Sequence, residues 1–224
     1  MDFERAIINC VSKLFKNCKI SCCYFHYIDS MWRNMSTKGY YELYSTNNGI
    51  KTAYRRLKSL PFIKRQDTIK AFKLIKKEAP IEFEKFLNYF EEYYIGLLCD
   101  GSNSLRKRPM FPVELWNVYD LSLNDEPRTN NSLESWHKSF ALDVKSHPDV
   151  TDLIRKFLDK QHEMEILYKQ LSSGDFYPRK STELAKDDLI KETIAKYSDE
   201  TILSTLDKVD EIMRNNSSKV KKIN

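Results

Sequence analysis

Helical spacing of apolar residues along nearly the whole chain is the feature that most constrains its fold. Only one segment departs from it, because Lys19–Phe25 (KISCCYF) is short and apolar and predicts a buried strand. A single strand cannot pair its own backbone N–H and C=O groups, and a strand buried on both faces needs neighbours in a sheet. The chain is therefore either all-helical, with this segment misjudged, or it holds one strand of a sheet whose other strands lie upstream.

Ten segments are predicted to be helical. Only five glycines and seven prolines occur among 224 residues, which favours long regular elements with few tight turns. The predicted helices are Phe3–Phe15, Phe25–Met35, Ile50–Leu60, Thr68–Glu78, Pro80–Ile95, Val113–Tyr119, Asn130–Val144, Val150–Leu171, Leu184–Lys196 and Asp199–Arg214. The clearest predicted loop is Asp100–Pro112 (DGSNSLRKRPMFP), and Asn124–Thr129 is a predicted turn.

Composition narrows the class of protein. An apolar share of 41% is enough for a hydrophobic core and argues against wholesale disorder. The five cysteines are an odd set, four of them between Cys10 and Cys23, which is unlike a secreted disulfide framework and favours a reducing compartment. The start MDFERAII lacks an apolar signal region, and no run of about 18 apolar residues predicts a membrane span.

Positive charge is concentrated in residues 51–77. The ten cations there are Lys51, Arg55, Arg56, Lys58, Lys64, Arg65, Lys70, Lys73, Lys76 and Lys77. Asp67 is the one acid, so the stretch carries +9; because the whole chain carries +5, the remainder is net negative by 4. A solvated helix face is the usual explanation of a charge run, but one sign alone favours contact with the DNA backbone, which is sequence-indifferent and salt-dependent. Arg106, Lys107 and Arg108 in the predicted loop either add to this surface or belong to a nuclear import signal.

Three separated segments share the order and spacing of a known family. Residues 1–35 hold an Asp-Phe-Glu, a helix, a strand, a Cys-x-x-His and a Trp-Arg, represented by Asp2, Cys23, His26, Trp32 and Arg33. The second segment is FPVELWNVYD (111–120), and the third is PRTNNSLESWHKSF (127–140), with an Asn-Asn-x-x-Glu-x-Trp-His pattern around Glu134. Over residues 1 to about 172 the chain resembles the C-terminal part of the catalytic domain of Mutator-like (MULE) DDE transposases, which are enzymes of transposable elements. Each motif alone is weak, and the three together are specific.

The resemblance implies an α/β remnant of an RNase H-like core with a large all-α insertion, predominantly helical as an isolated chain. The implied segments are a helix-strand-helix half-core (1–39), the insertion (40–125), the core helix of Glu134 with a long helix (126–172), and C-terminal helices with a frayed tail (173–224). In the family, three carboxylates hold Mg²⁺ or Mn²⁺ for DNA cleavage and strand transfer. Asp2 and Glu134 correspond to two of them, while the first aspartate is expected upstream of Met1. We therefore expect a truncated chain without activity of its own, nuclear in location and open to oligomer formation.

Each of these residues also has a plainer explanation. Asp2 suits a helix N-cap, and Glu134 suits the first turn of a helix, where the dipole favours an acid. The resemblance implies that Cys23 and His26 belong to a motif packed near the active site; the alternatives are half of a zinc site or, more simply, a half-buried pair that orders the junction between strand and helix. His137, three residues after Glu134, either contacts DNA or metal-bound water, or serves as a core or capping residue. Trp32, Trp116 and Trp136 are expected to anchor the core.

Three functional classes follow from the sequence. The first is a transposase-derived fragment, inactive alone. The second is a domesticated DNA- or protein-binding module that uses the basic helical segment. The third is a fragment of a longer gene product with no function of its own.

Overall fold

The structure is a computed structural model, and it describes residues 3–102, 104–144, 146–175 and 179–215. Within these ranges the fold is helical and contains no β-strand. Residues Leu98 and Arg106 form one isolated antiparallel bridge. The predicted α/β remnant of an RNase H-like core is therefore wrong, because the described residues hold no sheet into which a helical insertion could be built.

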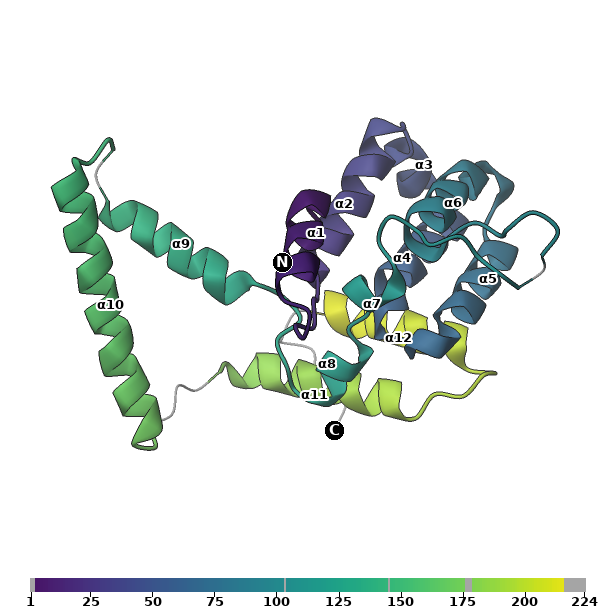
Figure 1. Cartoon of the computed structure of the whole chain (residues 1–224). Helices are drawn as coiled ribbons and strands as arrows, with labels where there is room; N and C mark the ends of the chain where they lie inside the picture. The colour runs from purple at the N-terminus through teal and green to yellow at the C-terminus, as the bar shows by residue number, and fades with distance from the viewer. Residues whose placement is uncertain (1–2, 103, 145, 176–178, 216–224) are drawn as a thin grey trace. The chain divides into compact units, whose positions relative to one another are not determined.

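Helices follow one another along the chain, and the longest connection within the described residues of unit 1 is the loop 96–112 between η4 and α7 (Figure 1). The α-helices are α1 (Arg5–Leu14), α2 (Tyr24–Thr37), α3 (Tyr41–Thr46), α4 (Asn48–Ser59), α5 (Thr68–Glu78), α6 (Glu84–Phe90), α7 (Val113–Trp116), α8 (Tyr119–Leu123), α9 (Asn131–Asp143), α10 (Val150–Ser172), α11 (Ser181–Ala195) and α12 (Ile202–Arg214). Three 3₁₀ turns are η1 (Leu60–Phe62), η2 (Arg65–Asp67) and η3 (Ile81–Phe83), and η4 (Glu91–Ile95) is a π-helical extension of α6. All ten predicted helices are confirmed, with shifts of a few residues at their ends. The predicted helix Val113–Tyr119 is broken at residues 117–118, and Pro80–Ile95 passes from 3₁₀ through α to π geometry without a gap.

The predicted strand Lys19–Phe25 has a different structure. Residues 19–23 belong to no helix or strand, and α2 begins at Tyr24. The Cys22 N–H donates to the Leu115 carbonyl over 2.6 Å, and the Tyr24 N–H donates to the Arg128 carbonyl over 2.9 Å. Cys22 and Cys23 are buried. The buried part of the segment is therefore residues 22–24, where α7 and the chain after α8 accept two of its backbone hydrogen bonds.

The chain divides into two compact units. Unit 1 comprises residues 1–129 and 182–224, and unit 2 comprises residues 130–181. The four segments implied by the resemblance (1–39, 40–125, 126–172 and 173–224) remain a prediction. The division into two units reflects how the chain packs, and it does not test which segments derive from a transposase.

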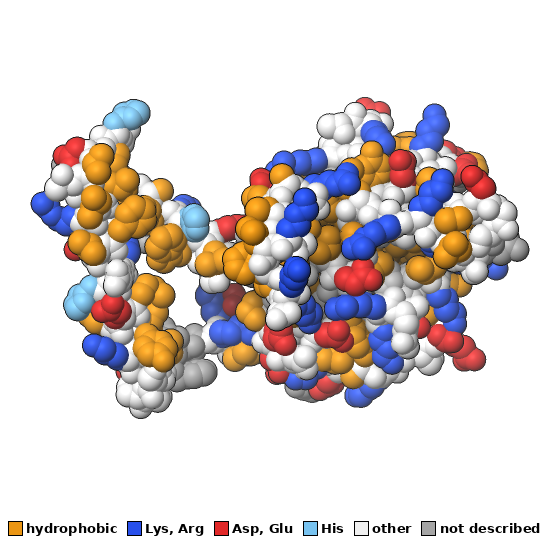
Figure 2. All heavy atoms as spheres, viewed as in Figure 1, with side chains coloured by type: hydrophobic (Ala, Val, Ile, Leu, Met, Phe, Trp, Pro, Cys, Tyr) orange, Lys and Arg blue, Asp and Glu red, His pale blue; other side chains and the backbone are white. Residues whose placement is uncertain are grey.

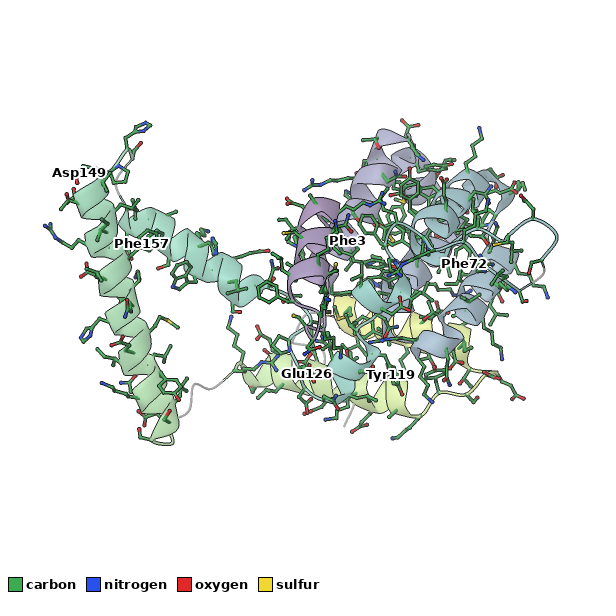
Figure 3. The ribbon with its side chains drawn as sticks, viewed as in Figure 1. Phe3, Phe72, Tyr119, Glu126, Asp149 and Phe157 are labelled. Carbon is green, nitrogen blue, oxygen red and sulfur yellow. The ribbon has the colours of Figure 1, made fainter. Side chains whose placement is uncertain are left out.

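Unit 1 has a core rich in aromatic side chains. Tyr27 of α2 stacks on Trp116 at 5.3 Å between ring centroids, and its hydroxyl donates to the Leu57 carbonyl over 2.8 Å. Phe90 stacks on Tyr94 at 4.9 Å, which continues the aromatic stripe of α6 into η4. Large rings remove much apolar area from water per residue, and their offset and edge-to-face contacts add to the stability of the core. Figure 3 shows the side chains of unit 1, with Phe3 and Phe72 among those labelled.

Unit 2 consists of α9 and α10, and neither helix has a buried residue. The two helices meet where Phe140 stacks on Phe157 at 5.0 Å and where Lys160 pairs with Asp143 at 2.7 Å. Trp136 remains 37% exposed, so the expectation that it anchors a core is wrong, whereas Trp116 is fully buried as expected. Within the described part of the chain, no helix combines the length and apolarity that crossing a membrane requires.

Candidate functional site

The basic run of residues 51–77 lies largely against acids of the same fold. Arg56 of α4 binds Asp207 of α12 through two nitrogens, each 2.8 Å from a carboxylate oxygen, and also binds Glu78. The hydrogen bonds to Asp207, opposed by burial and supported by Glu78, raise the pKa of Arg56, so this side chain stays charged. A two-pronged Arg–carboxylate pair has fixed geometry and is among the stronger surface interactions.

Asp210 of α12 lies at the centre of a second group of cations. Its side chain is only 4% exposed, with Lys58 Nζ at 3.2 Å, Arg55 Nε at 3.8 Å and Arg214 Nε at 2.6 Å. A buried carboxylate needs such partners, because the desolvation of an unpaired charge is costly. The cations of α4 therefore hold α12 in place, and α12 lies against α4 and α5 (Figure 1).

The remaining cations of the run differ in their partners. Arg65 pairs with Asp120, Lys70 with Asp199 and Lys76 with Glu91, at 3.7, 2.6 and 2.7 Å. Lys51 and Lys64 lie over the rings of Tyr44 and Tyr197. Within the described ranges, Lys73 and Lys77 form no ion pair. Most of the predicted DNA-binding charge is thus matched inside unit 1, and DNA binding by this run remains a prediction.

The loop after η4 is shaped by Gly96 and Arg106. Gly96 has a φ of +92°, and a Cβ at this position would stand 2.0 Å from the Lys107 carbonyl oxygen. This close approach brings the two arms of the loop together, with the Lys107 N–H donating to the Leu97 carbonyl over 2.8 Å and the Cys99 N–H donating to the Leu105 carbonyl over 2.9 Å. The loop after η4 therefore resembles a tight hairpin, in which backbone hydrogen bonds join its two arms.

Arg106 holds this loop from inside. Its guanidinium donates to the Gly96 carbonyl and, over 2.8 Å, to Glu91, and its side chain is 9% exposed. Burial raises the pKa of Glu91, but hydrogen bonds from Lys76 and Arg106 outweigh burial and leave this pKa below its ordinary value. Arg106, predicted to add to the DNA-binding surface, is occupied within the fold.

Lys107 and Arg108 point in another direction, into a pocket of about 570 Å³ between the loop and α1. We call it the basic pocket; its lining includes Arg5, Asn9, Ser12, Glu92, Tyr93, Lys107 and Arg108. Arg5, Lys107 and Arg108 are exposed, and none of the three forms an ion pair with the described residues. Figure 2 shows Lys and Arg side chains gathered around α1 and the neighbouring loop. With Glu92 counted, the lining carries a net charge of +2.

Helix α1 is held beside the loop by a few apolar contacts. Phe3 meets Phe111 edge to face at 5.0 Å between ring centroids, and Ile8 is the one buried residue of α1. The Phe111 N–H in turn donates to the Tyr93 carbonyl, and the Trp116 indole N–H donates to the Phe111 carbonyl. Polar residues at positions 5, 9 and 12 follow helical spacing and so face the pocket together.

The predicted catalytic pair is only partly described. Asp2 lies outside the described residues. Glu134 lies in the first turn of α9 in unit 2, where its side chain is exposed. His137 follows one turn later, also exposed, with its ring 5.2 Å from that of Trp136. Metal binding by Asp2 and Glu134 stays a prediction, and no group of three or more His, Cys, Asp or Glu side chains among the described residues is arranged to hold a metal ion.

Cys23 and His26 lie at the start of α2. Cys23 is the buried residue that precedes the helix, and His26 is half-buried one turn into it. His26 lines a second pocket of about 590 Å³ together with Glu4, Asp29 and Asn34. Asp29 pairs with Arg33 at 2.7 Å, and Glu4 adds a further acid, so this lining carries a net charge of −1 and differs from the basic pocket.

Comparison with known proteins identified no similar protein. No protein-family model, no curated protein and no solved structure matches the chain.

Sequence patterns alone do not single out Arg5, Asn9 or Ser12 as site residues. The helical spacing of these polar residues is visible in the sequence and predicts that they share a face. Their position beside Lys107 and Arg108 depends on the packing of α1 against a loop about 100 residues later in the chain. A local sequence pattern cannot predict a contact over that separation.

Proposed function

We propose that unit 1 binds the phosphate backbone of DNA through the basic pocket. The proposal rests on one observation: Arg5, Lys107 and Arg108 converge from two distant segments and lack ion-pair partners among the described residues, whereas most cations of the 51–77 run are bound to acids. A cation that is already paired with a buried carboxylate would lose that pair on binding a phosphate. Cations without an ion-pair partner are therefore expected to contribute most of the binding.

The chemistry of the lining suits phosphate oxygens. Arginine offers several N–H donors in a planar fork, lysine offers a point charge, and the Asn9 amide adds a neutral donor. Contacts of this kind position a duplex without identifying its sequence. We therefore expect weak binding that does not depend on sequence, with a dissociation constant on the order of 10⁻⁶ to 10⁻⁴ M at physiological salt.

Descent from a Mutator-like transposase is a separate part of this proposal. It is supported by the three sequence segments, and the absence of a sheet in the described residues removes its expected RNase H-like core. Backbone binding does not need a complete metal site, so the binding proposal is independent of that ancestry.

Fluorescence anisotropy with a labelled duplex at about 50 mM salt tests the proposal. The double variant Lys107→Gln/Arg108→Gln removes two pocket cations, and we expect binding at least about tenfold weaker. Lys85→Gln/Lys208→Gln is the matched control, because it removes two exposed charges outside the pocket and is expected to change affinity less than about twofold. Equal losses in the two variants would show that net charge alone, and not the pocket, governs binding.

A further inference from the structure

Helix α10 carries a seven-residue repeat on its surface. The residues that alternate at spacings of four and three are Val150, Ile154, Phe157, Gln161, Met164, Tyr168 and Leu171. This spacing averages 3.5 residues and gives one continuous seam along the helix, as in a coiled coil. We call this set the α10 seam. Gln161 at its centre is the one polar member.

The α10 seam is exposed except where Phe140 of α9 packs against one side of Phe157. Its six apolar members are between 48% and 73% exposed, and α9 contacts the seam through the Phe140–Phe157 ring stack. Figure 2 shows exposed hydrophobic side chains along α10, and Figure 3 labels Phe157 where the two helices of unit 2 meet. A helix with this repeat normally buries its seam against a second helix of the same repeat.

We propose that the α10 seams of two copies of this chain pair in parallel as a two-stranded coiled coil. In this register every seam residue faces its own counterpart. Gln161 would meet Gln161 of the second copy. Its amide nitrogen already donates one hydrogen bond to Glu165 of the same helix over 3.0 Å, which leaves a second N–H donor and the carbonyl oxygen for its twin. One polar residue at a core position favours a defined register at some cost in stability. The self-complementarity of the central residue is therefore an argument for a second copy as the partner.

The flanks of the seam are also complementary in this register. In a parallel coiled coil, the residue just before each of Ile154, Gln161 and Tyr168 lies close to the residue five places later on the other helix. Lys160 would then approach Glu165 of the second copy. Lys160 already binds Asp143 and Glu163 of its own chain. An ammonium group has three N–H donors, so the third can bind Glu165 of the second copy. The same rule places Leu153 beside Leu158 of the second copy, which is an apolar pair, and Leu167 beside Ser172 at the end of the helix.

The area involved predicts a weak dimer. A helix of 23 residues is roughly 34 Å long. Burying the exposed parts of the six apolar seam residues removes roughly 600 Å² of apolar surface per copy, somewhat below the ~800 Å² per partner of a stable interface. We expect a dissociation constant in the micromolar range, on the order of 10⁻⁵ M.

Sedimentation equilibrium of the full chain from about 5 to 200 µM tests the pairing. The wild type is expected to shift from its monomer mass of 26.6 kDa towards a dimer as concentration rises. Gln161→Glu sets two carboxylates against each other and should weaken the dimer at least about tenfold, while the same change at Gln170, on the outward side of α10, should leave it intact. Because the seam is exposed in the single chain, circular dichroism should show equal helix content in both variants.

Two results would overturn the proposal. One is a wild type that remains monomeric at 200 µM, about twentyfold above the expected dissociation constant. The other is a dimer that Gln161→Glu and Gln170→Glu affect equally, which would place the contact elsewhere.

A cross-link tests the parallel direction separately. Leu171→Cys, in a chain with the exposed Cys10 and Cys18 replaced by serine, should form a disulfide between copies under mild oxidation. Antiparallel helices would hold the two new thiols tens of ångströms apart, because position 171 lies near one end of α10. A dimer that forms no such disulfide would contradict the parallel register.

Discussion

Gly96 shows how one missing Cβ shapes the loop that presents the pocket cations. Its φ is +92°, and a Cβ there would lie 2.0 Å from the Lys107 carbonyl oxygen, which leaves no room for a side chain. Gly96→Ala is expected to lower the free energy of unfolding by about 3 kcal/mol, since it combines backbone strain with a steric clash. Urea denaturation measures this change.

Gly101 supplies the control for that substitution. It also has a positive φ, +74°, but nothing lies within 4 Å of a Cβ placed there. Gly101→Ala should therefore cost only the backbone strain, about 1 kcal/mol. If both alanines cost the same, the contact with Lys107 is not what requires glycine at position 96.

At the residue scale, residue type alone predicts some environments and not others. Trp116 is buried, as its size suggests, whereas Trp136 is partly exposed because unit 2 has no core to receive it. Arg106 and its neighbours Lys107 and Arg108 look equivalent in the sequence. They differ because the chain direction at the bridge to Leu98 turns Arg106 inward towards Glu91.

At the scale of elements, the contact between α4 and α12 depends on a buried acid. Asp210→Asn keeps the shape of the side chain and removes its charge, which leaves Lys58, Arg55 and Arg214 without their shared partner. We expect a loss of about 2–3 kcal/mol in unfolding free energy, below the full cost of breaking a buried pair because the cations are partly exposed. Thermal denaturation at neutral pH measures it.

Asp199→Asn is the matched control for Asp210→Asn. Its partner Lys70 is 48% exposed and Asp199 is 68% exposed, so water screens the pair. The expected loss is below about 0.5 kcal/mol. A loss at position 199 as large as that at position 210 would mean that burial does not set the strength of these pairs.

The helices can be predicted because their signal is local. Both ends of Thr68–Glu78 follow from the sequence, since apolar spacing and the neighbouring Pro61 and Pro80 bound this helix. The strand predicted at Lys19–Phe25 is wrong because a short apolar run has the same composition whether it lies in a sheet or in a connection packed against helices. Only the partners of its N–H groups, Leu115 and Arg128, distinguish the two, and they lie about 90 to 105 residues away.

At the scale of the whole molecule, the sequence predicts that ion pairs form but not which cations they include. The sequence shows +9 in residues 51–77 against a net −4 elsewhere, which predicts that acids and bases meet somewhere in the fold. It does not show which cations are matched. Asp207 and Asp210 find their partners about 150 residues earlier in the chain, and this pairing decides which positive charges remain for a ligand.

The salt dependence of DNA affinity tests most directly whether the pocket cations contact phosphates. Anisotropy titrations between about 50 and 200 mM salt give the slope of log affinity against log salt. Each phosphate contact contributes about 0.9 to this slope, so Lys107→Gln/Arg108→Gln should make it shallower by about 1.8 than that of the wild type. Equal slopes for wild type and variant, or wild-type binding that does not respond to salt, would contradict phosphate binding at the basic pocket.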